Sequence, residues 1–245
     1  LGPGAGSARA LGSELPARLE RLLGRDATIR AIIEQVRTSR FVSIVGPGGM
    51  GKTTVAVALA HAVLEEFAGD VCFVDLGSLR DPLQVASALC SALGFVPASE
   101  DLAASLPAFL RDRRTLVVLD SCEHLIDTVA PLAERLVGAA GVHVLATSRE
   151  ALRVEGEHVH RLAPLASPPE GSTIAATEAL AFPAVGLFVE RATASGTRFV
   201  LSDEDAPVVS DLCRKLDGIA LAIEFAAGRV EAYGLRGTVS LLENR

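Results

Sequence analysis

The stretch that decides the fold is Phe41–Thr54, FVSIVGPGGMGKTT. Its first five residues are apolar or β-branched apart from one serine, which predicts a short buried strand. The alanine- and leucine-rich residues 55–64 that follow it predict a helix. Between them, Gly46–Thr54 matches the pattern G-x-x-x-x-G-K-[ST] of a phosphate-binding loop. The motif therefore lies between a strand and a helix, which is the context its chemistry requires.

This loop predicts nucleotide binding. Its glycines can adopt positive φ and turn backbone N–H groups inward, where the positive end of the helix also attracts phosphate. Lys52 is one of only two lysines in a chain with 23 basic residues, and it would reach the β- and γ-phosphates, while the Thr53 hydroxyl would bind Mg²⁺. The alternative is a glycine-rich turn without a ligand. The expected nucleotide contacts are Gly46, Gly48, Gly49, Met50, Gly51, Lys52, Thr53 and Thr54.

Composition narrows the class of protein. The chain has 245 residues, of which 49% are hydrophobic and 4% aromatic, enough for one sizeable domain and a smaller one. No apolar stretch reaches the roughly 18 residues of a membrane span, so we expect no membrane contact and a cytoplasmic protein. The four cysteines are far apart, which favours buried free thiols over a metal site. The net charge of −7 argues against direct nucleic-acid binding.

Apolar strand-like runs alternate with helical segments along the first two thirds of the chain. Further strands are expected at residues 71–76, 116–120, 142–147 and 159–162. Alternation of this kind predicts an α/β fold with a doubly wound, parallel, five-stranded sheet. We expect residues 1–14 to be disordered or an expression remnant, 15–165 to form the nucleotide-binding domain, 166–180 a linker, and 181–245 a small all-helical lid.

Ligands of such sheets bind at the carboxyl ends of the strands, where three segments should meet. Asp120 ends the third strand beside the loop, where its carboxylate could complete the oxygen shell of Mg²⁺; the alternative is an ordinary turn-starting Asp. Arg149 follows Thr147 and Ser148 at the end of the fourth strand. It could approach the γ-phosphate, or it could be a surface arginine paired with Glu150 or Glu155.

The helical segment has no basic face. Residues 181–245 contain nine Asp and Glu against seven Lys and Arg, which argues against a DNA-binding helix-turn-helix. Helices are expected at 184–194, 206–216, 219–229 and 237–242. A lid or regulatory subdomain is the better interpretation.

At this point the chain resembles the STAND class of signal-transduction P-loop NTPases, in the branch of NB-ARC domains and large bacterial transcriptional regulators. The resemblance rests on the phosphate loop and four further segments in the same order. In relatives, the counterparts of Leu23, Gly24 and Arg25 lie against adenine and ribose, and those of Ala220 and Leu221 close over the base. The four segments are Leu22–Asp26, Thr115–Leu125, Thr147–Glu157 and Leu216–Glu224.

The resemblance implies an ATP- or ADP-binding switch with Mg²⁺ that serves transcriptional regulation. Many relatives place a second acid after the magnesium-binding Asp, and here that position is Ser121, with Glu123 the nearest substitute. We therefore expect slow or conditional ATP hydrolysis, with Lys52, Asp120, Glu123 and Arg149 as the catalytic candidates. Ala220 also replaces the usual proline.

The implied partners are the nucleotide and the remaining domains of a larger parent protein. In the resembling family these are winged-helix, sensor and output domains, and the chain ends before the winged helix. ATP-dependent self-association is also implied. Two alternatives remain open, a scaffold that holds ADP without turnover and a phosphotransferase built on the same loop.

Overall fold

The computed structural model describes residues 15–18, 21–96, 101–171, 174–194 and 199–243; the segment 1–14 lies outside them. The chain divides into two compact units. Of the described residues, the first unit contains 15–18, 28–46 and 52–161, and the second contains 21–27, 47–51 and those from 162 onward. Each unit is described by itself.

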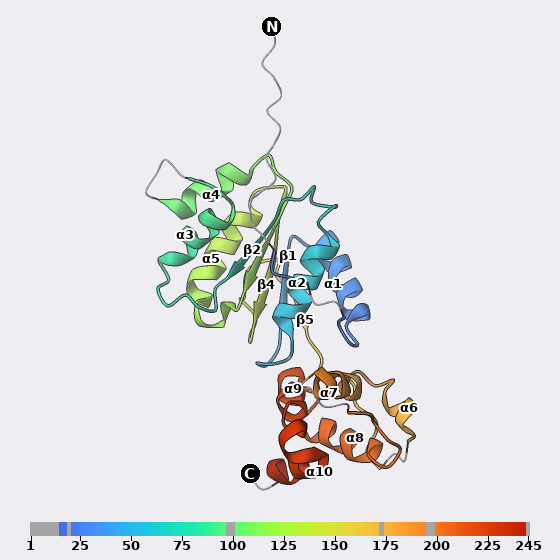
Figure 1. Ribbon diagram of the computed structural model, residues 1–245. Helices are drawn as coiled ribbons and strands as arrows, with labels where there is room; N and C mark the ends of the chain where they lie inside the picture. Colours follow the sequence, from blue (N-terminus) through green and yellow to red (C-terminus); the bar gives the residue numbers. More distant parts are fainter. Residues whose placement is uncertain (1–14, 19–20, 97–100, 172–173, 195–198, 244–245) are drawn as a thin grey trace. The chain divides into compact units, whose positions relative to one another are not determined.

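The first unit is built on a five-stranded sheet in the order β2-β3-β4-β1-β5 (Figure 1). All four strand pairs are parallel, so the predicted α/β fold class is confirmed. The strands are β1 (Phe41–Val45), β2 (Val71–Asp75), β3 (Thr115–Asp120), β4 (Val142–Ser148) and β5 (His158–Arg161).

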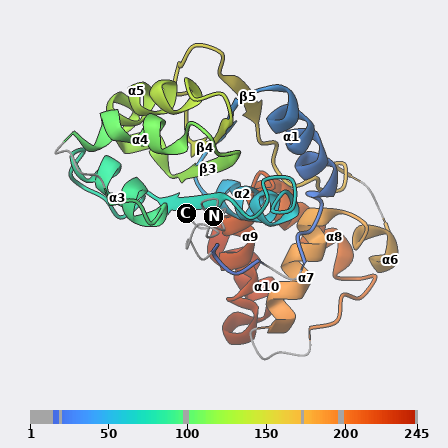
Figure 2. The same cartoon turned by 90° about the horizontal axis from the view of Figure 1, so that it is seen from above.

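Helices cover both faces of this sheet, with α3, α4 and α5 on one side and α1 and α2 on the other (Figures 1 and 2). The two-sided cover explains why β1 and β3 are buried along their whole length. The helices are α1 (Asp26–Thr38), α2 (Lys52–Ala62), α3 (Gln84–Ala92), α4 (Leu102–Leu110), the 3₁₀ turn η1 (Cys122–His124) and α5 (Ile126–Val137).

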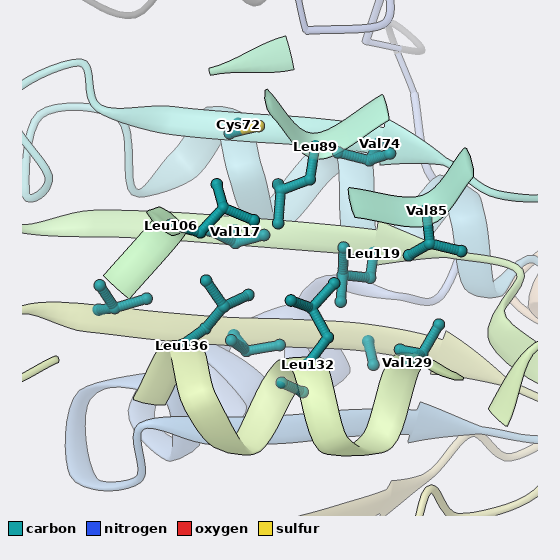
Figure 3. Close-up of a cluster of buried hydrophobic side chains, with 14 of the residues drawn as sticks. Cys72, Val74, Val85, Leu89, Leu106, Val117, Leu119, Val129, Leu132 and Leu136 are labelled. Atoms are coloured by element: carbon teal, nitrogen blue, oxygen red, sulfur yellow. The ribbon is translucent and has the colours of Figure 1, made fainter. Parts of the chain in front are cut away.

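Aliphatic side chains form the larger hydrophobic core. Val117 and Leu119, two residues apart on β3, point to the same face and meet Leu89 of α3 and Leu132 of α5 (Figure 3). All four are at most 5% exposed. This packing fixes β3 under α5 and thereby places Asp120, the last residue of β3, at the edge of the sheet.

The second unit is helical, as predicted. Its core gathers Val185 and Phe188 with Leu212 and Ile223, all at most 2% exposed. The sequence did not predict the one-turn helix α6, and the last helix begins earlier than expected and is interrupted at Gly234, where φ is 67°. The helices are α6 (Ala176–Ala179), α7 (Pro183–Ala194), α8 (Ala206–Lys215), α9 (Ala220–Ala227) and α10 (Val230–Glu243).

Within the described residues, no helix is both long enough and apolar enough to cross a membrane.

Candidate functional site

Strand order brings the predicted site residues of the first unit together. Because β4 lies between β1 and β3, the start of the phosphate loop, the end of β4 and Asp120 share one edge of the sheet. The Gly46 N–H donates to the Ser148 carbonyl at 3.3 Å, and the Ser121 N–H donates to Thr147 Oγ1 at 2.9 Å. Hydrogen bonds that involve both backbone and side-chain groups therefore hold this edge of the sheet together.

Asp120 is a buried carboxylate, 3% exposed, surrounded by hydroxyl groups. Thr53 Oγ1 donates to Oδ2 at 2.9 Å, Ser121 Oγ donates to Oδ2 at 3.3 Å, and Thr147 Oγ1 donates to Oδ1 at 2.6 Å. Burial raises the pKa of Asp120, and the hydrogen bonds from the hydroxyl groups oppose that rise. The two residues predicted to hold Mg²⁺, Thr53 and Asp120, are therefore in direct contact.

Lys52 begins α2 and is partly buried. Its Nζ donates to the Gly46 carbonyl at 2.8 Å, which folds the side chain back over the loop. Burial lowers the pKa of Lys52, and the nearby charge of Glu123 opposes that shift. Thr54 lies in the first turn of the same helix. Of the four loop glycines, Gly49 and Gly51 have positive φ, whereas Gly46 and Gly48 do not.

Arg149 pairs with Glu123. Its Nε lies 3.2 Å from Glu123 Oε1, and its side chain remains 68% exposed. The predicted alternative partners are therefore wrong, since Glu150 instead pairs with Arg153. The other oxygen of Glu123, Oε2, is buried and has no hydrogen-bond partner within the described part of the chain. Two of the three catalytic candidates outside the loop, Glu123 and Arg149, are thus paired with each other.

Sequence reasoning placed Thr147 at this edge without a role and did not place Asp75 there. Thr147 bridges the carboxylate of Asp120 and the backbone of Ser121, a residue in the left-handed region with φ of 63°. Asp75, the last residue of β2, is the register partner of Asp120, and its charge further raises the pKa of Asp120. The position of Asp75 at the end of a buried strand could be read from the sequence. That it lies beside Asp120 depends on the order of the strands in the sheet.

The segment Leu22–Asp26 and the middle of the phosphate loop belong to the second unit. Arg25 is 6% exposed and donates from Nη1 to the Ala163 carbonyl at 2.7 Å and from Nη2 to the Met50 carbonyl at 3.0 Å. Gly24 has φ of 66°, and a Cβ there would lie 2.3 Å from Pro183 Cγ, so only glycine fits.

Three further residues predicted to contact the nucleotide lie near the loop backbone or in the helical core. The Leu221 N–H, in the first turn of α9 just after Ala220, donates to the Gly49 carbonyl at 3.0 Å. Leu23 and Ala220 pack against the hydrophobic cluster of this unit. Their contact with adenine stays a prediction.

Comparison with known proteins gives a consistent picture. Residues 34–153 match the family of AAA domains. A Mycobacterium tuberculosis protein named as an HTH-type transcriptional regulator is 37% identical over 206 residues, which are 83% of this chain and 21% of that protein. The regulatory protein AfsR of Streptomyces coelicolor is 30% identical over 240 residues, 90% of this chain and 22% of AfsR. The chain thus spans about a fifth of these relatives.

The solved structure of a Signal Transduction ATPase with Numerous Domains from Pyrococcus horikoshii has the same fold. Its TM-score is 0.54 at 18% sequence identity, and the match covers 86% of this chain and 30% of that one. The recognition made from the motifs is confirmed: residues 34–153 are a P-loop ATPase domain of the AAA type, and the chain is similar in sequence to an HTH-type transcriptional regulator and to AfsR.

Proposed function

We propose that the chain is a nucleotide-dependent switch module that binds ATP or ADP with Mg²⁺ at its phosphate loop and serves a larger transcriptional regulator. The observation that carries the proposal is the contact between Thr53 Oγ1 of the loop and Asp120 Oδ2, at 2.9 Å. A buried carboxylate beside a phosphate loop is costly to maintain without a cation to bind. Lys52, one residue before Thr53, adds the phosphate-binding charge.

The donor set fits magnesium. Hard oxygen ligands suit Mg²⁺, which takes one or two protein groups and completes its octahedral shell with waters and phosphate oxygens. Thr53 and Asp120 supply such oxygens, and no cluster of three or more His, Cys, Asp or Glu that could hold a metal occurs among the described residues. When bound, magnesium neutralises phosphate charge. Thr53 and Asp120 would hold it next to the phosphates that Lys52 contacts.

Hydrolysis in this proposal is slow because Glu123 is engaged. A residue that orients an attacking water must have a free carboxylate oxygen within reach, and here Arg149 holds Oε1 while Oε2 is buried. Ser121 occupies the position where many relatives have a second acid, and its hydroxyl bonds Asp120 instead. Turnover therefore requires Arg149 to leave Glu123, and the negative charge of the γ-phosphate would draw its guanidinium away.

The switch itself needs a difference in affinity. A nucleotide can shift a conformational balance only as far as its affinities for the two states differ. Arg149 is the group that distinguishes ATP from ADP in this proposal, since it can exchange Glu123 for the γ-phosphate. The winged-helix, sensor and output domains, and self-association in the ATP form, belong to the same proposal.

One alternative is favoured by a specific observation. The Arg149–Glu123 pair and Ser121 would both suit a scaffold that holds ADP and never hydrolyses ATP. Phosphate release from Mg-ATP separates the two functions. Release that Asp120→Ala abolishes and Glu123→Gln reduces supports the switch with turnover, whereas release no greater than that of Lys52→Ala supports the scaffold.

Equilibrium titration with Mg-ATP and Mg-ADP tests nucleotide binding. The chain offers a matched control because it has only two lysines, Lys52 in the loop and Lys215 at the end of α8. We expect Lys52→Ala to lose at least about tenfold in affinity, since it removes a charge-assisted phosphate contact. Lys215→Ala should bind as the native protein does. Equal affinities for all three proteins would contradict the proposal.

A further inference from the structure

Arg25 is a buried cation whose function is open. Its guanidinium donates to two carbonyl groups, and none of the ion pairs formed among the described residues includes it. Burial lowers its pKa, with no acidic group opposing the shift. A buried charge without a counter-charge is costly, so its retention beside a phosphate loop requires a reason. The inference drawn below rests on the proposed function, because it concerns the phosphates of the same nucleotide.

Two backbone carbonyl groups of the phosphate loop accept hydrogen bonds from residues of the second unit. Arg25 Nη2 holds the Met50 carbonyl at 3.0 Å, and the Leu221 N–H holds the Gly49 carbonyl at 3.0 Å. Arg25, Leu221, Gly49 and Met50 all belong to the second unit. The tethers come from residues that lie far from the loop in sequence, 25 positions away in the case of Arg25.

Each tether also orients an N–H group. In a trans peptide the C=O and the N–H of the same plane point in opposite directions, and all described peptide bonds here are trans. Holding the Gly49 carbonyl therefore turns the Met50 N–H away from Leu221. Holding the Met50 carbonyl turns the Gly51 N–H away from Arg25.

These two N–H groups are available to a ligand. No hydrogen bond from the backbone nitrogen of Met50 or Gly51 is formed within the described part of the chain. Gly49 and Gly51 have φ of 78° and 87°, which successive N–H groups need in order to converge on an anion. We propose that Arg25 is a positioning residue for phosphate: it holds the Met50–Gly51 peptide so that consecutive N–H groups donate to the phosphates, and its charge is balanced when they bind.

This role differs from a contact with the base. Both Nη atoms of Arg25 are already committed to the carbonyl groups of Met50 and Ala163. Replacing Arg25 should therefore weaken the binding of ligands that contain phosphate and leave the binding of adenine unchanged. Adenosine, which has the base without phosphate, and pyrophosphate, which has phosphate without the base, distinguish the two possibilities.

The experiment measures the affinities of Mg-ADP, pyrophosphate and adenosine for the native protein, Arg25→Met and Arg25→Lys. Arg30→Met on α1 is the control, since Arg30 is exposed. We expect Arg25→Met to weaken ADP and pyrophosphate by about tenfold, as the loss of one charge-assisted hydrogen bond predicts. Adenosine should change less than about twofold. Arg25→Lys should rescue part of the loss, because it keeps the charge without the planar fork.

Circular dichroism shows whether each variant folds. If Arg25→Met does not fold, Arg25→Lys and the native protein decide the matter. In the native protein, pyrophosphate should slow hydrogen exchange at the Met50 and Gly51 amides. Unchanged exchange there, or an equal loss for adenosine and pyrophosphate in a folded variant, would overturn the inference alone. A native protein that binds neither ADP nor pyrophosphate would overturn the proposed function as well.

Discussion

Replacing Thr147 with valine removes the hydroxyl that connects Asp120 to the backbone of Ser121. The side chain is 1% exposed, and valine has nearly the same shape, so packing is conserved. What disappears is the donor to Asp120 Oδ1 at 2.6 Å and the acceptor of the Ser121 N–H at 2.9 Å. Asp120 Oδ1 and the Ser121 N–H stay in place without this partner, whereas Asp120 Oδ2 keeps its hydrogen bonds from Thr53 and Ser121.

The cost follows from these two lost bonds. A buried polar group left without its partner destabilises the folded state by about 1–3 kcal/mol. Two such groups cost about 2–6 kcal/mol, and replacing a buried hydroxyl with a methyl group returns about 1–2 kcal/mol. We therefore expect Thr147→Val to lower the free energy of unfolding by about 2.5 kcal/mol at pH 7, the difference between the midpoints of these two ranges.

Thr115→Val is the matched control. Thr115 is also buried on a central strand, but its hydroxyl has no hydrogen-bond partner within the described residues. The same chemical change should there leave stability unchanged or raise it by up to about 2 kcal/mol. Urea unfolding of the native protein and the two variants, followed by circular dichroism, measures the difference.

The pH dependence gives a second test. The Thr147 hydrogen bond lowers the pKa of Asp120, against the larger effect of burial that raises it above 3.8. The cost of Thr147→Val should thus be complete while Asp120 is ionised, and it should shrink as the pH falls and the carboxylate gains a proton. If Thr147→Val and Thr115→Val change the free energy of unfolding equally at pH 7, the account of how Asp120 is held is refuted.

Three more predictions concern the same site. Burial raises the folded-state pKa of Asp120 above its unfolded value, so the ionised carboxylate destabilises the folded protein at neutral pH. Asp120→Asn should therefore increase the free energy of unfolding in urea at pH 7, and this increase should disappear as the pH falls toward 3.8. Gly49→Ala should destabilise more than Gly51→Ala by thermal unfolding: both bear the roughly 1–2 kcal/mol of left-handed φ, but only at Gly49 would the added Cβ approach a leucine Cβ, at 2.9 Å. A double-mutant cycle of Arg149→Gln and Glu123→Gln should give a coupling energy below about 1 kcal/mol, because Arg149 is 68% exposed; a larger value would show that the pair is not easily opened.

Local patterns were enough to predict the framework of the site. The strand of residues 41–45 was predicted from its run of apolar residues, and the loop after it from the spacing of its glycines and the helix propensity of the next segment. All of these signals arise between residues that are close in sequence. The position of Asp120 at the end of a buried strand has the same origin. The domain boundaries at 15–165, 166–180 and 181–245 stay predictions.

Contacts that depend on strand order or on a distant partner were not predictable in this way. Thr147 and Asp75 flank Asp120 only because β4 and β2 lie on either side of β3, which one sequence does not reveal. Arg25 and Ala163 are 138 positions apart. For Arg149 the sequence offered the γ-phosphate or the nearby Glu150 and Glu155, but not Glu123, which follows a different strand.

The most direct test of the central claim is the effect of Mg²⁺ on ATP affinity, measured with and without the metal in the native protein, Thr53→Val and Asp120→Asn. The account predicts that Mg²⁺ tightens ATP binding to the native protein by at least about tenfold, and that either substitution removes most of this gain while metal-free binding changes little. A magnesium effect of the same size in all three proteins would contradict it.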